Sequence, residues 1–356
     1  MTHKRLSLVV ALSIAGSLGA CAQVTGSART PNHATKEMRL AAIRQAQVWK
    51  ATDVPSMDLR SGPQGPGSFE PNETVTCDYR KKETTGASPK FTCVRPPDDE
   101  LKVKYGRFNG EVFAEVAASR LFWALGFAAE RMYPVRVVCR GCPSKIRGTE
   151  IASIQRKTPG KDIETSEISG WNWSELDQVD PAAGGAPRAH RDALKLLAVL
   201  IQHTDSKAEQ QRLICVGPRT NVREVESCAE TFMLAHDLGL TFGRSTLFNR
   251  NPVSSTNLAE WSRASVWSGS EGCVGNLPRS QTGSLDNPII AEGGRKFLAD
   301  LLVQLSDKQL YDLFDTARFQ RRSTASDDSP DTTTVAQWVE AFKQKRNDVV
   351  NRVCPG

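Results

Sequence analysis

The chain has 356 residues, of which 39% are hydrophobic and 24% are charged, proportions that are ordinary for a globular protein. Its formal net charge is +6 and no basic run stands out, so the composition gives no indication of nucleic-acid binding. After the first 20 residues, no apolar stretch approaches the roughly 20 residues that a membrane-spanning helix needs. The remainder is long enough for one large domain or two lobes, and we expect a soluble body.

The first residues have the pattern of an export signal. Lys4 and Arg5 precede a short apolar stretch, residues 6–18, and small residues follow it, which together predict a secretory signal peptide over residues 1–20. The sequence Leu18-Gly19-Ala20-Cys21 resembles the lipobox of bacterial lipoproteins. The resemblance implies cleavage before Cys21 and attachment of palmitate and other lipid to that residue. An ordinary signal peptide with a chance cysteine is the alternative.

The residues after the cysteine refine this expected address. Ala22 stands where the lipobox rule would place Asp for inner-membrane retention, so the resemblance implies an outer-membrane anchor facing the periplasm or the surface. Residues 22–36 are small and polar, which suits a flexible tether, and we assign residues 21–50 to a lipid-anchored tether and short helix. Loss of Lys4 and Arg5 with the signal lowers the formal charge from +6 to +4.

The cysteines indicate disulfide bonds. Nine are present, and the eight other than Cys21 are an even number in an expected oxidising compartment. Cys77 and Cys93 flank one predicted hairpin, and Cys215 and Cys228 flank another. Cys139 and Cys142 form a C-x-x-C, and Cys273 and Cys354 remain. Their connectivity stays open. A zinc site or a redox C-x-x-C is a weaker alternative, because no H-x-x-x-H is present and the C-x-x-C lies in a loop-like stretch.

The apolar pattern predicts an α+β chain with a strand-rich first part and a mostly helical second part. The first part holds a short helix at 37–50, strands at 74–79, 90–94, 101–105, 135–138 and 150–155, and a strong helix at 111–127. Residues 158–188 are loop-like. The second part holds helices at 190–203, 296–305, 308–319 and 334–353 and strands at 212–216 and 232–235.

Three short motifs follow one another in this frame. The first is Lys102-Val103-Lys104-Tyr105-Gly106, a strand with lysines, followed by a helix with Glu111 and Glu115. The second is His203-Thr204-Asp205-Ser206-Lys207, at the end of a buried helix, with Gln210 five residues after the Asp. The third is His236-Asp237-Leu238-Gly239, after the predicted second hairpin.

This order resembles the protein-kinase-like fold, most closely its HipA-type and phosphoinositide-kinase-like branches, over roughly residues 70–320. The resemblance implies two lobes, an N-lobe at 51–157 and a C-lobe at 158–356. It further implies an exported phosphotransferase that moves phosphate from Mg²⁺ and ATP, or another nucleotide, to a hydroxyl of an unknown acceptor. Apart from the membrane and that acceptor, no partner is implied.

The resemblance also implies roles for the nucleotide-binding residues. Lys104 would sit against the α/β-phosphates, and Lys102 shares its face because strand side chains alternate. Glu115 would hold Lys104. It is preferred to Glu111 because it precedes Val-Ala-Ala-Ser-Arg-Leu much as the family's helix glutamate does.

The catalytic and metal roles fall on the second and third motifs. Asp205 would accept or orient the proton of the attacking hydroxyl, and Lys207 would neutralise the transferred phosphoryl group. Asp237 and Gln210 would hold Mg²⁺ through oxygen atoms. Separately, each of these side chains is also compatible with a solvated surface or a local turn.

Several departures from the family favour a second function. No G-x-G-x-x-G lies between the first two strands, and the turn at 84–88 has one glycine, Gly86. Gln210 replaces the usual Asn, which moves its amide oxygen by about 1.5 Å. The alternative is therefore a non-catalytic envelope protein on a degenerate kinase-like scaffold. In a third alternative, an unrelated α+β fold, Lys104, Asp205 and Asp237 would lie more than about 15 Å apart.

Two other groups of residues have structural and functional interpretations. His203 and His236 are expected to be structural more often than catalytic. The tryptophans at 171, 173, 261 and 267 could form a carbohydrate-stacking platform, but core packing is the more common role.

Overall fold

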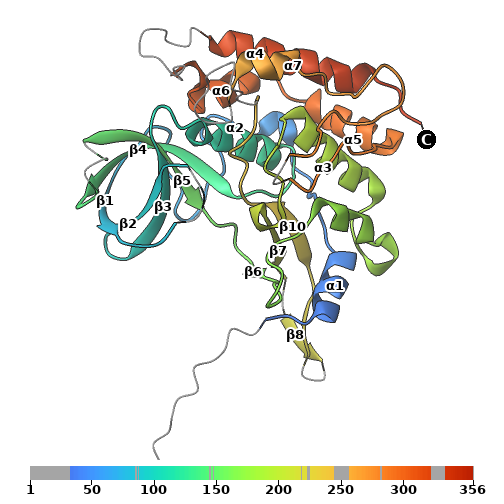
Figure 1. Cartoon of the computed structure of the whole chain (residues 1–356), viewed down its shortest axis with the longest axis horizontal. Helices are drawn as coiled ribbons and strands as arrows, with labels where there is room; N and C mark the ends of the chain where they lie inside the picture. The colour runs from blue at the N-terminus through green and yellow to red at the C-terminus, as the bar shows by residue number, and fades with distance from the viewer. Residues whose placement is uncertain are drawn as a thin grey trace, which may run out of the picture. The chain divides into compact units, whose positions relative to one another are not determined.

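The computed structural model describes residues 33–84, 86, 88–143, 146, 148–217, 219–222, 225–243, 256–280, 283–321 and 333–355 (Figure 1). Residues 33–356 form one unit. The predicted signal peptide, Cys21 and most of the predicted tether lie outside the described residues, so the export signal and lipid anchor stay predictions. No helix in the described ranges is both long and apolar enough to cross a membrane.

Five strands of the first part close into a barrel. Their neighbour order is β1-β2-β3-β5-β4, and their bounds are Thr74–Arg80 (β1), Lys90–Arg95 (β2), Asp99–Tyr105 (β3), Arg131–Arg140 (β4) and Thr149–Arg156 (β5). All five were predicted as strands. The barrel itself was not predicted, because it depends on a parallel pairing of β1 with β4, in which Cys77 lies opposite Cys139. The residues of neither segment contain a local pattern that predicts this pairing.

The two faces of the β2–β3–β5 sheet have opposite character. Side chains that alternate along the strands fill the barrel with apolar groups, including Phe91, Val103 and Ile154. The residues between them point to the other face. There Lys90 lies opposite Lys104, and Thr92 lies opposite Lys102. The polar face of the barrel therefore carries the lysines of the first motif.

The main helix of the first part, α2 (Glu111–Ala124), is buried on nearly all sides. It belongs to the large core shared with the C-terminal helices rather than to the barrel core, and it contacts β4, β5 and α6. In Figure 1 it lies between the barrel and the C-terminal helices. A helix that is apolar all round has to be buried in this way, and this packing fixes the position of Glu111 and Glu115.

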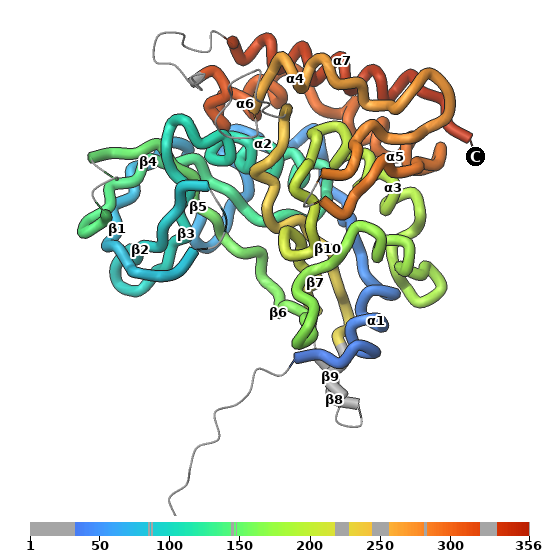
Figure 2. The backbone as a smooth tube through the Cα atoms, in the orientation of Figure 1, coloured from blue at the N-terminus to red at the C-terminus, as the bar shows by residue number. Residues whose placement is uncertain are grey.

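The second part of the unit is mostly helical, with a small sheet. Its helices are α3 (Arg188–Leu200), α4 (Leu258–Arg263), α5 (Glu292–Leu302), α6 (Asp307–Thr316) and α7 (Val335–Asn351), and α1 (Lys36–Arg44) precedes the barrel. The strands are β6 (Lys161–Asp162), β7 (Gln211–Cys215) and β10 (Thr231–Ala235), and β8 (Arg219–Val222) pairs with β9 (Val225–Cys228). The backbone in Figure 2 leaves the barrel after β5 and runs to β6.

The predicted helices and strands agree with these bounds to within a few residues, except that the helix predicted at 37–50 ends at Arg44. Some elements were not predicted. The loop-like stretch at 158–188 contains β6 and the short 3-10 helices Trp173–Gln178 and Pro181–Ala183, and α4 lies in a region that could not be assigned from sequence. Three further 3-10 helices are Val54–Ser56, Ala208–Gln210 and Phe319–Arg321. The four tryptophans considered for a stacking platform are buried, so the prediction that they pack in the core is confirmed.

The eight cysteines considered for disulfides form four bonds. The pairs are Cys77–Cys93, Cys139–Cys142, Cys215–Cys228 and Cys273–Cys354. The predicted disulfides are therefore present. A four-thiolate zinc site would need these sulfurs as free thiolates, which the bonds exclude.

Candidate functional site

Lys104, at the end of β3, is the centre of a buried charge cluster. Its Nζ lies 2.7 Å from Glu111 Oε2, 2.8 Å from Glu115 Oε1 and 3.2 Å from Asp237 Oδ1. The Lys104 side chain is 2% exposed and that of Glu115 is 3% exposed. Three carboxylates from α2 and from the segment after β10 thus share one ammonium group.

Local structure explains how α2 supplies two of these groups. Glu111 and Glu115 are four residues apart, so they lie on the same side of the helix, one turn from each other. The helix begins directly after the turn that ends β3, where Asn109 accepts the backbone N–H of Glu111. Both glutamates therefore reach Lys104. From the sequence, Glu115 was the preferred partner of Lys104, and Glu111 had no predicted role.

The cluster changes the protonation of its members. Burial alone would lower the pKa of Lys104, but the nearby carboxylates of Asp237, Glu115 and Glu111 raise it well above its usual value. Burial raises the pKa of Glu115, an effect that Lys104 opposes and Asp237 reinforces. Burial also works against ionisation of Asp237, yet the ammonium group of Lys104 holds the pKa of that carboxyl well below its usual range. The ionised form of Asp237 is therefore favoured beside Lys104.

Asp205 lies in a second group of side chains, after α3. Its Oδ2 accepts a hydrogen bond from Gln210 Nε2 at 3.0 Å and lies 3.7 Å from Lys207 Nζ. Its Oδ1 is buried and has no hydrogen-bond partner among the described residues, which is a costly arrangement for a carboxylate oxygen. Since Gln210 donates its nitrogen to Asp205, its amide oxygen is left for another ligand.

Backbone hydrogen bonds join this group to the Lys104 cluster. The carbonyl of Gln210 accepts the backbone N–H groups of His236 and Asp237 at 2.9 and 3.2 Å, and Thr204 N–H donates to the carbonyl of Leu240. The two motifs therefore lie against each other, and Asp237 belongs to both groups. The third alternative, in which the motifs lie far apart, is not the arrangement seen here.

Hydrogen bonds between Ser206 and the segment at Ser284 and Leu285 hold the backbone next to Asp205. Ser206 is buried, and its Oγ accepts the backbone N–H groups of Ser284 and Leu285. Ser284 Oγ donates back to the carbonyl of Ser206 at 2.6 Å. These bonds fix the backbone next to Asp205. This interaction was not predicted from the sequence, because nothing in the residues around two serines 78 positions apart indicates that they form hydrogen bonds with each other.

Asp237 of the first group and Lys207 and Gln210 of the second line a cleft of 870 Å³, whereas Lys104, Glu115 and Asp205 lie behind its described lining. One wall is the polar face of the barrel, with Lys90, Lys102 and Gln155, and the other wall contains Lys207, Gln210 and Asp237. Gly86, in the turn with one glycine, also lines the cleft. Lys90 was not singled out from the sequence, although its alternation with the apolar residue Phe91 could have placed it on this face.

The donor set can be compared with the needs of Mg²⁺. The described residues gather no three His, Cys, Asp or Glu side chains that could hold a metal ion by themselves. However, Mg²⁺ commonly binds one or two carboxylates together with substrate phosphates. Asp237, the free amide oxygen of Gln210 and the unpartnered oxygen of Asp205 are oxygen ligands of this kind. The residues fit an ion that arrives with phosphates.

The two histidines of the motifs are held by structural contacts. His203 is fully buried, its ring lies 6.0 Å from that of Trp173, and burial lowers its pKa to about 4. His236 lines the cleft, and its Nδ1 lies 3.3 Å from both Glu130 Oε1 and Gln155 Nε2. Glu130 is held in turn by Arg212.

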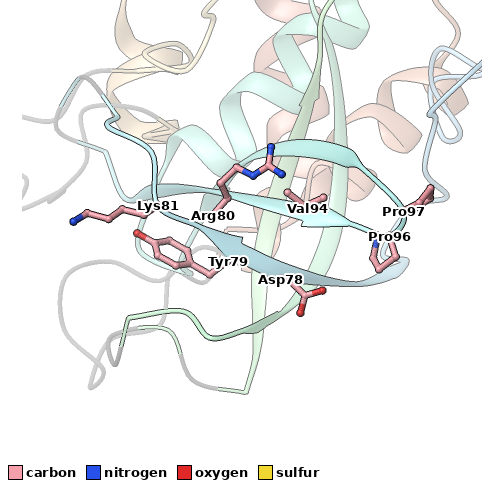
Figure 3. Close-up of a pocket in the computed structure, with 7 residues that line it drawn as sticks. All are labelled: Asp78, Tyr79, Arg80, Lys81, Val94, Pro96 and Pro97. Atoms are coloured by element: carbon pink, nitrogen blue, oxygen red, sulfur yellow. The ribbon is translucent and has the colours of Figure 1, made fainter.

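A smaller hollow of 440 Å³ lies on the barrel at β1 and β2, away from these groups. Figure 3 shows that the side chains of Asp78 and Arg80 point in different directions rather than toward one centre. Both are engaged elsewhere, Asp78 with Arg140 and Arg80 with Glu100. This hollow therefore has no convergent set of reactive groups.

Comparisons with known proteins give structural similarities but no match from sequence families or curated proteins. No family model matches the sequence, and no curated protein matches it. The structure is similar to the crystal structure of a Helicobacter pylori proinflammatory kinase, CtkA, with a TM-score of 0.44 and 11% sequence identity, over 79% of this chain and 96% of that chain. The chemistry of the site has to come from the chain's own residues.

Proposed function

We propose that this chain is a phosphotransferase with a kinase-like, two-lobed arrangement, which moves phosphate from a Mg²⁺-bound nucleotide to a hydroxyl of an unidentified acceptor. The observation that carries the proposal is the contact of Lys104 with Glu115 and Asp237 at the edge of a cleft whose other wall holds Gln210 and Lys207. Phosphoryl transfer needs positioning and charge stabilisation above all, and this cleft offers both.

The proposed chemistry assigns one task to each side chain. The hydroxyl oxygen of the acceptor attacks the terminal phosphorus while the bond to the bridging oxygen breaks, so the shortened phosphate chain leaves. Asp205 accepts the hydroxyl proton through its unpartnered Oδ1. Lys104 binds the phosphate chain, held in place by Glu115. Lys207 stabilises the charge of the phosphoryl group in transfer.

Mg²⁺ would be held by Asp237 and Gln210 and would supply positive charge to the phosphate oxygens. The carbonyl of Gln210 already accepts the N–H of Asp237, which keeps these two residues at a fixed spacing. Asp237 contacts Lys104 in this structure, so it would exchange part of that contact for the ion when substrate binds.

Binding of Mg²⁺ and nucleotide by the purified full chain tests this function. We expect Mg-nucleotide to raise the melting temperature, and we expect ³³P-labelled donor to transfer label to the chain itself or to an envelope extract. Asp237→Asn should abolish the shift, whereas Asp205→Asn should keep the shift and abolish transfer. As a matched control, Asp78→Asn, on the far hollow, should change neither. No shift and no transfer in the unaltered chain would contradict the function.

The alternative, a non-catalytic binding or structural protein on a degenerate scaffold, is favoured by two observations. The turn beside the cleft has one glycine, and the described residues hold no ready-made metal cluster. Under this alternative, Asp205→Ala and Asp237→Ala leave the cellular phenotype of a deletion fully complemented. Loss of complementation at normal protein levels argues against it.

The proposed place of action is the cell envelope, with lipid on Cys21 anchoring the chain to the outer membrane. The four disulfides support an oxidising compartment. Cells grown with labelled palmitate should label the chain, and Cys21→Ser should abolish the label and release the protein from membranes. Cys139→Ser serves as a control for loss of a cysteine. An unchanged label in Cys21→Ser would refute the anchor.

A further inference from the structure

The described lining of the 870 Å³ cleft contains no aliphatic or large apolar side chain. Among the described residues that line it, none is Ala, Val, Leu, Ile, Met, Phe, Tyr or Trp. The surface is made of lysines, an arginine, carboxylates, amides, threonines, a glycine and one histidine. Every described lining residue except Gly86 therefore carries a polar or charged group.

Such a lining is poorly suited to a nucleobase. Pockets that hold ring-shaped ligands are lined mainly by apolar and aromatic side chains, and bases gain binding energy by stacking on aromatic faces. The one ring in the described lining, His236, is already engaged through its Nδ1 with Glu130 and Gln155. A base entering this cleft would meet the aliphatic parts of long polar side chains, but no aliphatic or further aromatic side chain among the described lining residues.

The same lining is well suited to a chain of phosphates. Lys90 and Lys102 both line the cleft, and neither has an ion-pair partner among the described residues. The strand register sets Lys90 directly opposite Lys104, whose own ammonium group is already compensated by Glu111, Glu115 and Asp237. Burial, and the positive charge of Lys104 next, lower the pKa of Lys90. A strongly anionic ligand would supply the counter-charge that Lys90 lacks among the described residues.

Cations also stand on the other wall and elsewhere in the lining. Lys207 lies 3.7 Å from Asp205 and lines the cleft together with Gln210. Lys82 and Lys157 also line the cleft, and each has an acid partner, Glu100 and Asp162 respectively. Ammonium groups therefore extend across the cleft from the barrel face to the Asp205 segment. Lysine binds phosphate as a compact point charge that can follow a flexible chain.

From this lining we infer that the cleft selects its donor by the phosphoanhydride chain and not by a base, so that inorganic polyphosphate and any nucleoside triphosphate bind alike. The inference rests on the proposed function and narrows its donor. The bond that breaks is the same terminal phosphoanhydride bond, so no further reactant is needed. A base-free donor is recognised through the ammonium groups and Mg²⁺ alone.

Titration calorimetry on the purified full chain with Mg²⁺ tests the inference. The probes are inorganic tripolyphosphate, ATP, GTP and adenosine. We expect the dissociation constants of the three phosphate compounds to agree within about threefold, since a shared phosphate chain supplies the binding energy, and we expect no heat from adenosine. Binding of ATP at least about tenfold tighter than both GTP and tripolyphosphate, or binding of adenosine alone, overturns the inference and leaves the phosphotransferase standing. If none of the phosphate compounds binds, both fail.

A pair of variants separates anion binding from folding. Lys102→Met should weaken all three phosphate compounds by about tenfold, as expected for loss of one charge-assisted contact. It should leave the melting temperature of the free protein nearly unchanged, because Lys102 lies opposite the neutral residues Thr92 and Gln155 and has no ion-pair partner among the described residues. Lys50→Met removes the same charge from an exposed position outside the cleft and should change neither quantity. If Lys102→Met weakens binding no more than Lys50→Met does, the inference is wrong.

Discussion

The ammonium group of Lys104 and the carboxylate of Glu115 form a 2.8 Å ion pair whose side chains are only 2% and 3% exposed. Two more carboxylates, those of Glu111 and Asp237, reach the same ammonium group. The pair therefore has a structural consequence apart from any catalytic one. Lys104 is the charge that permits three acids to lie together beside α2.

Lys104→Met should destabilise the protein strongly. Removing one partner of a buried charge cluster typically costs about 3–5 kcal/mol, because the remaining charges are left without compensation. Glu115→Gln should cost much less, because burial already raises the pKa of Glu115 and two carboxylates still contact Lys104. Urea unfolding of both variants measures the difference. Equal effects of the two substitutions would show that Lys104 does not organise the cluster.

His203 should make stability depend on pH. Burial lowers its pKa in the folded state to about 4, below the ordinary value near 6.5 of the unfolded chain. Between these values the unfolded chain binds a proton that the folded protein excludes, so stability is full above about pH 6.5 and falls as the pH drops toward about 4. The loss over this window is about 3 kcal/mol.

Unfolding free energies at pH 7 and pH 4.5 check this prediction. Other groups titrate in the same window, so the His203→Gln variant provides the comparison. Its stability at pH 7 can be lower than that of the original chain, but its decrease between the two pH values should be smaller by about 2–3 kcal/mol. An identical decrease in both proteins would mean that His203 does not titrate as the buried site requires.

Gly239→Ala should disturb the Lys104 cluster by crowding the side chain of Glu111. A Cβ atom at this position would lie 2.8 Å from Glu111 Cγ and 3.0 Å from Glu111 Oε2, the atom that contacts Lys104. We expect a loss of about 1–3 kcal/mol in the free energy of unfolding, as is usual for overpacking. Gly293→Ala is the matched control, because its Cβ would lie 3.7 Å from the nearest atom and the residue is in α5. The control should be neutral or stabilising.

Much of the fold could be predicted from local patterns. The alternation of apolar residues along β3 and the continuous apolar sequence of α2 are properties of short segments, and both predicted the elements seen here. The order of Lys104, Asp205 and Asp237 along the chain also suggested one site. Side-chain alternation placed Lys102 on the face of Lys104, and the strand register supports this.

The rest depends on contacts between distant segments. The barrel closes because β1 pairs with β4, and the Asp205 segment is held by Ser206 and Ser284. Neither pairing leaves a pattern in the residues on either side. Glu111 was passed over because the family resemblance offered one helix glutamate, whereas helical geometry places two glutamates four residues apart on the same face. For this pair, helical geometry predicted the contacts with Lys104 better than the family resemblance did.

The disulfide Cys273–Cys354 should contribute more to stability than Cys139–Cys142. The first joins residues 81 positions apart and the second joins residues 3 positions apart, and a bond that closes a longer loop restricts the unfolded chain more. The Cys273→Ala/Cys354→Ala variant should lose about 2–4 kcal/mol in the free energy of unfolding, and Cys139→Ala/Cys142→Ala should lose less. Urea unfolding without reductant measures both. Because Cys354 N–H also donates to Glu292 Oε2 in α5, the first variant should in addition release the end of the chain, seen as faster amide exchange after α7. A larger loss from the Cys139–Cys142 variant would mean that the β4–β5 connection, rather than the C-terminal attachment, is the segment that the disulfides stabilise most.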